Sequence, residues 1–126
     1  MSDVKTISVT IPANEAVSST ADLGSSSLVA IEMPETWAGT SITFQSKAKV
    51  TEDVDGGPAL EDLDNVYDSG GNEITWTVAA NRVVVPTAAH ESAMAPLRYL
   101  RIRSGTSAAP VGQNPAKIIR LLVKNR

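Results

Sequence analysis

Short segments in which apolar and polar residues alternate recur along the whole chain. The clearest is 4–11, because Ile7, Val9 and Ile11 fall on one face of an extended strand before Pro12 ends it. Seven further short segments follow. Of these, 41–48 and 73–78 alternate as well, 28–33 is mostly and 83–85 wholly apolar, and 63–68, 97–103 and 118–123 are also typical of strands. The pattern therefore predicts about eight short strands.

The residues between these segments are typical of turns. Gly70 and Gly71 allow the positive φ of a tight hairpin, so we expect 63–68 to pair with 73–78. Residues 18–27 are small and polar, which indicates a loop or an edge, and 104–115 forms a long loop. Only 87–95 is helix-like, with Thr87 as its cap and Pro96 after its end.

Many short strands, one helical turn and no alternation of strands with helices indicate an all-β protein. We expect an antiparallel β-sandwich, jelly-roll-like, with a barrel as the alternative. Residues 1–126 should form a single domain, with an extended N-terminal arm and a C-terminal tail. The in-phase apolar positions predict a core that includes Ile7, Val9, Ile31, Phe44, Ile74, Trp76, Leu100 and Ile102.

Composition excludes several classes of function. Of the 126 residues, 42% are hydrophobic, which is enough for one core. There is no cysteine, so a disulfide scaffold, a thiolate zinc site and a cysteine nucleophile are excluded. No apolar run approaches the roughly 18 residues of a membrane span. Residues 1–5 lack the pattern of a signal peptide, so we expect a soluble chain made in the cytoplasm and no membrane partner.

The search for catalytic residues finds no usable combination. His90 is the single histidine, and it lies beside Glu91 in the helix-like stretch. A histidine base needs a nucleophile and an orienting acid, and Ser92, two residues away, has the wrong geometry on a helix. We therefore expect a surface histidine, no catalytic residue, no enzyme activity and no cofactor.

Acidic residues gather in 49–62, where Asp53 and Asp55 alternate before Gly56. Calcium loops use such oxygens at fixed offsets, but the first acid is missing here and Pro58 interrupts the rest. The segment is expected to be a solvated acidic loop that holds no metal. A loop that binds a partner is the second interpretation, and a calcium site is the third.

Charge is distributed unevenly along the chain. The residues from Leu97 onward carry seven bases and no acid, whereas 1–96 carry all 14 acids and four bases. Acidic and basic strands would then neutralise each other inside the fold, or the acidic loop of one subunit would meet the basic face of another. Nucleic acid is not expected as a partner, because the sequence pI is about 5.0.

Arginines occupy both faces of the segment 97–103. Arg101 and Arg103 alternate onto one face and Arg98 onto the other. A strand cannot bury arginines on both faces unless acids pair with them. We therefore expect at least one set at the rim of the sandwich, or paired with acids of 52–68 or of another subunit. All three are candidate partner-binding residues, with Asp53, Asp55 and Trp37.

The sequence predicts different environments for the two tryptophans. Trp76 is in phase with Ile74 and Val78, which favours core packing. Trp37 lies in a turn between Pro34 and Gly39, where it would cap the end of the sandwich or present its ring to a sugar.

The order of several strand-and-turn motifs resembles that of small virion structural proteins of tailed bacteriophages, over roughly residues 27–124. The motifs are Val29–Pro34 with Trp37, Ile42–Gln45, Tyr67–Asp68 with Gly71–Glu73, and Tyr99–Thr106. Some such proteins decorate or cement the capsid. The acidic insertion at 49–62 departs from the shorter loop expected there, and the resemblance transfers no functional residue.

The resemblance implies a structural protein in the virion, made in the host bacterial cytoplasm. It would bind the major capsid protein or other virion proteins, as a homo-oligomer or in many copies per particle. The segments Ile42–Phe44 and Tyr99–Ile102 are also similar to jelly-roll, galactose-binding-like modules. The alternative is therefore a carbohydrate-binding module on a phage head or tail fibre for host attachment, with a glycan as partner.

Overall fold

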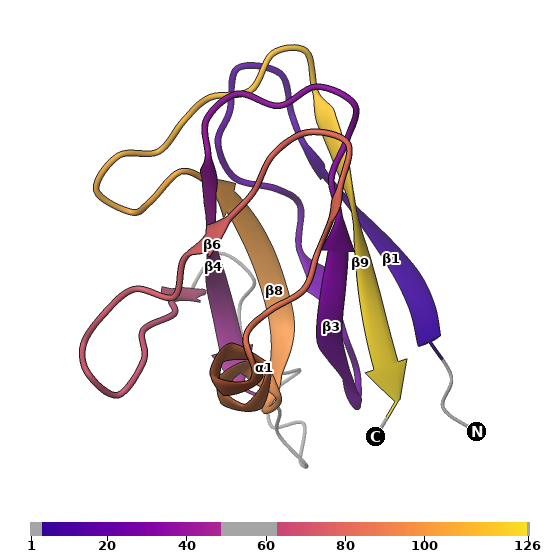
Figure 1. Cartoon of the computed structure of the whole chain (residues 1–126), viewed down its shortest axis with the longest axis vertical. Helices are drawn as coiled ribbons and strands as arrows, with labels where there is room; N and C mark the ends of the chain where they lie inside the picture. The colour runs from indigo at the N-terminus through magenta and orange to yellow at the C-terminus, as the bar shows by residue number, and fades with distance from the viewer. Residues whose placement is uncertain (1–3, 49–62, 126) are drawn as a thin grey trace, which may run out of the picture.

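The computed structural model describes residues 4–48 and 63–125. Two antiparallel sheets face each other, and one short helix lies at one end of the sandwich (Figure 1). The first sheet has the order β1-β9-β3-β7, and the second has the order β2-β8-β4-β5, with β6 also paired to β4. The elements are β1 (Val4–Ile11), β2 (Ala21–Asp22), β3 (Ser26–Glu32), β4 (Ser41–Ala48), β5 (Asp64–Asn65), β6 (Trp76–Thr77), β7 (Val83–Val84), α1 (Ala88–Met94), β8 (Leu97–Ser104) and β9 (Lys117–Asn125).

The chain passes back and forth between the two sheets. The strands β1, β3, β7 and β9 belong to the first sheet, and β2, β4, β5, β6 and β8 belong to the second. Every strand pairing that the structure describes is antiparallel. This order is that of a jelly roll, so the predicted all-β sandwich is confirmed. Viral capsid proteins and lectins both use the fold, so the topology alone does not choose between their functions.

The core lies between the sheets and follows the predicted alternation. Phe44, Leu100 and Ile102 have no exposed surface, and Trp76 is 4% exposed. The rings of Phe44 and Trp76 meet edge to face, with their centroids 4.9 Å apart. Ile7 is the exception among the predicted core residues, because it is only partly buried at the edge strand β1.

The predicted hairpin exists but is short. Tyr67 bridges Glu73, and the N–H of Ile74 donates to the carbonyl of Val66 at 3.0 Å. Beyond this point the two arms separate, because both pair with β4: β5 with Gln45 and Ser46, and β6 with Ser41 and Ile42. Pairing with the free edge of β4 therefore takes the place of most of the expected pairing between the two arms of the hairpin.

The helix α1 begins and ends where the sequence indicates. The side chain of Thr87 accepts a hydrogen bond from the N–H of His90 at 3.2 Å, and Pro96 follows two residues after the last helical residue. Met94 is buried, and the hydroxyl of Ser27 donates to the carbonyl of Ala95. The helix is therefore fastened to β3.

Gly105 starts the long loop after β8 in a conformation that only glycine adopts easily. Its φ is +82°, and an added Cβ would lie 2.4 Å from the carbonyl oxygen of Ala109 and 2.9 Å from the backbone nitrogen of Val111. Both contacts are with backbone atoms, so no side chain can rotate away to relieve them.

Gly105→Ala is expected to destabilise the protein by about 2–4 kcal/mol, because the backbone strain and the steric clash add. Denaturant unfolding would measure this loss. Gly71→Ala is a matched control, since Gly71 has a φ of +83° but nothing within 4 Å of an added Cβ. The control should cost only about 1–2 kcal/mol. Equal losses for the two variants would mean that the loop moves freely away from Gly105.

Candidate functional site

The outer surface of the second sheet carries a ladder of polar side chains. Because Ile42, Phe44, Leu100 and Ile102 point into the core, the residues between them in β4 and β8 point outward. The register sets them opposite each other in pairs: Thr43 with Arg103, Gln45 with Arg101, and Lys47 with Tyr99. We call these six residues the polar face.

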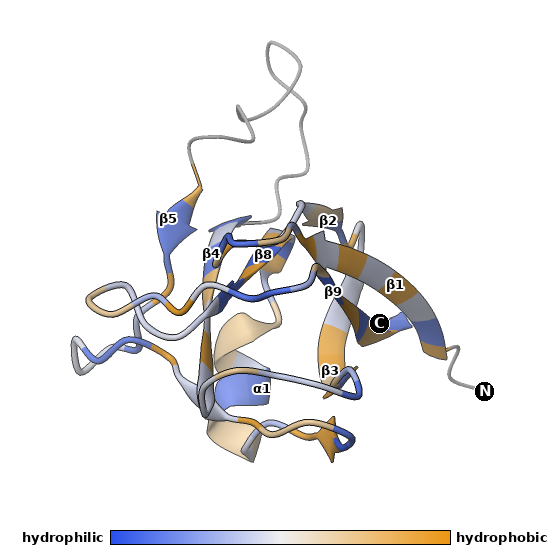
Figure 2. Cartoon of the chain, turned by 90° about the horizontal axis from the view of Figure 1, so that it is seen from above, coloured by the Kyte–Doolittle hydropathy of each residue, from blue (hydrophilic) through white to orange (hydrophobic). Residues whose placement is uncertain are grey.

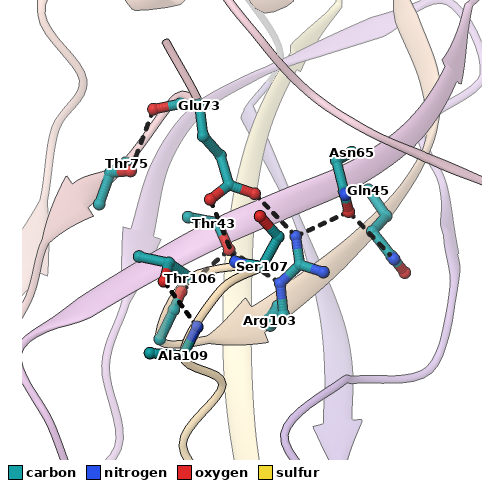
Figure 3. A network of polar contacts seen from close by, with 10 residues as sticks. Thr43, Gln45, Asn65, Glu73, Thr75, Arg103, Thr106, Ser107 and Ala109 are labelled. Atoms are coloured by element: carbon teal, nitrogen blue, oxygen red, sulfur yellow. Dashed lines mark hydrogen bonds and ion pairs between the residues drawn. The ribbon is translucent and has the colours of Figure 1, made fainter.

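Arg103 lies at the centre of a hydrogen-bond network at one end of the polar face (Figure 3). Its Nε donates to the hydroxyl of Thr43 at 3.1 Å, and its terminal nitrogen donates to Asn65 at 2.8 Å and to Glu73 at 2.9 Å. The ion pair with Glu73 is largely buried, since the two side chains are 8% and 13% exposed. Arginine suits this position because its planar guanidinium serves several acceptors at once.

The same network holds two loops against the polar face. The second carboxylate oxygen of Glu73 accepts from the N–H of Ser107 at 3.1 Å, and the hydroxyl of Thr43 donates to the carbonyl of Gly105 at 2.9 Å. The hairpin at 67–73 and the loop at 104–115 are therefore tied to β4 and β8. Arg103 was expected to bind a partner, but this geometry gives it a role inside the fold.

Arg98 lies at the other end of β8 and pairs with the edge strand β2. Its guanidinium donates to both carboxylate oxygens of Asp22, at 2.9 and 3.2 Å. This hydrogen bond from Arg98 is the main cause that lowers the pKa of Asp22 below its usual value. Burial opposes the shift, and the N–H of Gly24 adds to it. The Arg98 guanidinium also lies 4.9 Å from the ring centre of Tyr99, so both side chains are held in place.

The middle of the polar face is formed by half-buried polar side chains. The Nε of Arg101 donates to the hydroxyl of Thr20 at 2.9 Å, and Lys47 pairs with Asp64 at 2.8 Å. On the opposite sheet, Arg120 pairs with Glu32 at 3.0 Å. Three arginines of the basic C-terminal third, Arg98, Arg103 and Arg120, thus meet acids from the first 96 residues within one chain. For these three, the charge asymmetry is neutralised inside the fold.

Trp37, a predicted contact residue outside β8, does not extend the polar face. Trp37 is partly buried and packs against the core, and its Nε1 is buried with no partner among the described residues. The buried side chain of Gln113 fixes the neighbouring Ala38 by donating to its carbonyl and accepting from its N–H. Trp37 therefore packs partly against the core, as a cap would, and only part of its surface is open to solvent. Asp53 and Asp55 lie outside the described residues.

No arrangement for metal binding is found within residues 4–48 and 63–125, where no three histidine, aspartate or glutamate side chains gather. In the same part of the chain, no helix is long and apolar enough to cross a membrane. His90 is half-buried on α1, beside a shallow hollow that Trp76 and Val85 also line.

Sequence reasoning missed the partners of Arg103. Glu73 and Asn65 occupy unremarkable positions at the ends of short segments, and Thr43 looks like any polar residue of an alternating strand. The one available signal was the physical requirement for an acid near a buried arginine. That requirement pointed to acids at 52–68 or on another subunit, whereas the partner is Glu73 of the same chain.

No protein-family model matches this chain, and no curated protein or solved structure is significantly similar to it.

Proposed function

We propose that this jelly roll is a non-enzymatic structural protein that attaches to a larger protein assembly through its polar face. The observation that carries the proposal is the set of half-buried polar side chains on one rigid sheet surface: Gln45, Lys47, Tyr99 and Arg101. Their backbones belong to the two long central strands of the second sheet. Binding groups held in this way lose little conformational entropy when a partner docks.

The resemblance to virion proteins gives the proposal its specific form. The assembly would be the head of a tailed phage, and the partner its major capsid protein. The chain would then be a decoration protein, present in many copies on the virion after synthesis in the host bacterial cytoplasm. Such a role needs a rigid scaffold and a complementary surface, and it needs neither cofactor nor nucleophile.

Arg101 is the residue on which we expect partner binding to depend most. It lies at the centre of β8, between the ion pairs of Arg98 and Arg103. A guanidinium there can offer charge-assisted hydrogen bonds to a carboxylate of the partner. Charges at the rim of an interface set the rate of encounter and the choice of partner.

A carbohydrate-binding module is the second candidate. The partial burial of Trp37 counts against the platform expected from the sequence. The observation that favours it is Tyr67, which is 52% exposed in the same hairpin as Glu73.

Tyr67→Ala should abolish binding to an immobilised glycan if this function holds, and it should leave attachment to particles unchanged if the chain is a decoration protein.

Binding to purified phage particles is expected to weaken, without vanishing, when salt rises from about 0.1 M to 1 M. The screening length then falls from about 10 Å to about 3 Å. Arg101→Gln should weaken binding about tenfold at low salt and flatten the salt dependence, because one charge-assisted contact is lost. Cosedimentation of the protein with particles at the two salt concentrations measures both effects.

The matched control is Arg120→Gln, which removes the same charge from the outer surface of the first sheet. It should bind like the unchanged protein. Equal losses for the two variants would show that only net charge matters. Equal occupancy of the unchanged protein at both salt concentrations, with no effect of Arg101→Gln, would refute attachment through this face.

A further inference from the structure

The strand β1 forms an open edge of the first sheet. It pairs with β9 over its whole length, from Val4 opposite Lys124 to Ile11 opposite Lys117. Figure 2 shows β1 as the outermost strand on its side of the sandwich, with apolar and polar residues alternating along it. Among the described strands, none pairs with its outer side.

The hydrogen bonds of Thr10 show which backbone groups face the open side. Its N–H donates to the hydroxyl of Ser19 at 3.1 Å, and its carbonyl accepts from the N–H of Ser19 at 2.9 Å. Both groups of Thr10 therefore point away from β9. Since these directions alternate along a strand, the N–H and carbonyl groups of Val4, Thr6 and Ser8 also point outward.

The open stretch ends at Ser8, because Ser19 occupies the next outward-facing position. Val4, Thr6 and Ser8 are all exposed, and their outward backbone groups have no partner within the described residues. An exposed row of unpaired groups is a template for another strand. Its length, five residues centred on Thr6, limits which strand can fit.

We propose that a second copy of this chain occupies the edge, with β1 pairing antiparallel to β1 about a two-fold axis at Thr6. In this register Thr6 faces Thr6 of the second copy, and Val4 faces Ser8 of the second copy. All three outward-facing residues of each strand then find partners. The two first sheets join into one continuous sheet, and a two-fold pair is the commonest form of homo-oligomer.

The side chains on the inner surface of β1 support the same register. Lys5 lies opposite Ile7 of the second copy and not opposite a second lysine. Ile7 lines a hollow of about 340 Å³ together with Asp22, Leu23 and Val123. The alkyl chain of Lys5 would cover the exposed part of Ile7, and its ammonium would approach the carboxylate of Asp22.

Neighbouring registers are less favourable. An axis at Lys5 sets two ammonium groups directly opposite each other, which is destabilising. An axis at Ile7 requires Val4 to pair with the edge of Thr10, which Ser19 already fills. The Thr6 register alone uses the whole open stretch and meets neither obstacle.

The contact is small, so the dimer should be weak and reversible. Five residues from each copy bury less than the roughly 1,000 Å² that stable interfaces reach. The pairing does not depend on the proposed function, because it uses the first sheet and the polar face belongs to the second.

Cysteine cross-linking tests the axis directly, since the chain has no cysteine of its own. Residues in a hydrogen-bonded antiparallel pair have Cα atoms about 5.5 Å apart, within the range that a disulfide spans. Thr6→Cys should therefore form a covalent dimer under mild oxidation. The matched control is Thr10→Cys, on the same outer surface of β1. Its two cysteines would lie about 27 Å apart in the dimer, so no covalent dimer should form.

Sedimentation of the unchanged protein provides a second measurement that needs no cysteine. We expect a dimer that grows with concentration up to about 1 mM, in the range of weak complexes. Thr6→Pro should abolish the dimer and leave the fold intact, because the backbone N–H that proline lacks points away from β9. Thr6→Val keeps this N–H, so this variant should still form the dimer. A monomer at all concentrations, equal cross-linking of both cysteine variants, or a dimer that survives Thr6→Pro would each overturn the proposal. The proposal would also be overturned if the backbone amides of Val4–Ser8 are protected from hydrogen exchange only when a different protein is added.

Discussion

Arg103→Met is expected to destabilise the protein by about 3–5 kcal/mol, because it leaves the carboxylate of Glu73 buried without its charge partner. The substitution also removes the hydrogen bonds that Arg103 donates to the side-chain oxygens of Asn65 and Thr43. Urea unfolding followed by circular dichroism measures the change. We expect the 104–115 loop to loosen as well, since Ser107 is held through Glu73.

Two further variants show whether the loss of stability arises because the charges are buried or simply because an ion pair is broken. Arg120→Met breaks an exposed ion pair with Glu32 and should cost no more than about 1 kcal/mol. The double variant Arg103→Met with Glu73→Leu removes both buried charges, and it should recover most of the loss. If Arg103→Met costs no more than Arg120→Met, the network around Glu73 is not buried in solution.

Trp76→Ala is expected to cost about 3–5 kcal/mol, because it opens a large cavity beside Phe44. The indole is 4% exposed and its Nε1 has no hydrogen-bond partner among the described residues, so the loss comes from packing. Chemical denaturation gives the free energy of unfolding.

Trp37→Ala is the matched control, since Trp37 is only partly buried. It should cost clearly less than Trp76→Ala. A change below about 1 kcal/mol for Trp76→Ala would show that this residue does not belong to the core.

Local patterns in the sequence were sufficient for much of the fold. Alternation placed β1, β4 and β8 and chose the inward residues Phe44, Leu100 and Ile102. Cap and stop signals placed α1. These features follow from the periodicity of a strand and from short-range hydrogen bonding, which depend on neighbours in the chain.

Three of the two-residue strands, β2, β5 and β6, were harder to predict than β7. β2 lies within the segment 18–27, which the sequence predicts as a loop or edge, and β5 and β6 lie within the two segments 63–68 and 73–78 that it predicts to pair with each other. Such strands exist because a long neighbour offers its edge: β8 for Ala21–Asp22, and β4 for the other two. A local pattern carries no information about an edge supplied from elsewhere in the chain.

The candidate site shows the same division. Arginines on both faces of β8 were visible in the sequence, as was the need for acids to neutralise them. Which acids do so was decided by the order of the strands. Asp22 reaches Arg98 because β2 pairs with β8, and Glu73 reaches Arg103 because the hairpin folds over the β4 edge.

By itself, the sequence determined the fold class, the inward and outward faces of the long strands, and the absence of thiol chemistry, because composition and period are local properties. The tertiary structure alone decided that Arg103 serves the fold, that Trp37 is partly buried against the core, and that Val4, Thr6 and Ser8 face an open edge. Each of these depends on contacts between residues far apart in the chain, and the jelly-roll topology sets those contacts.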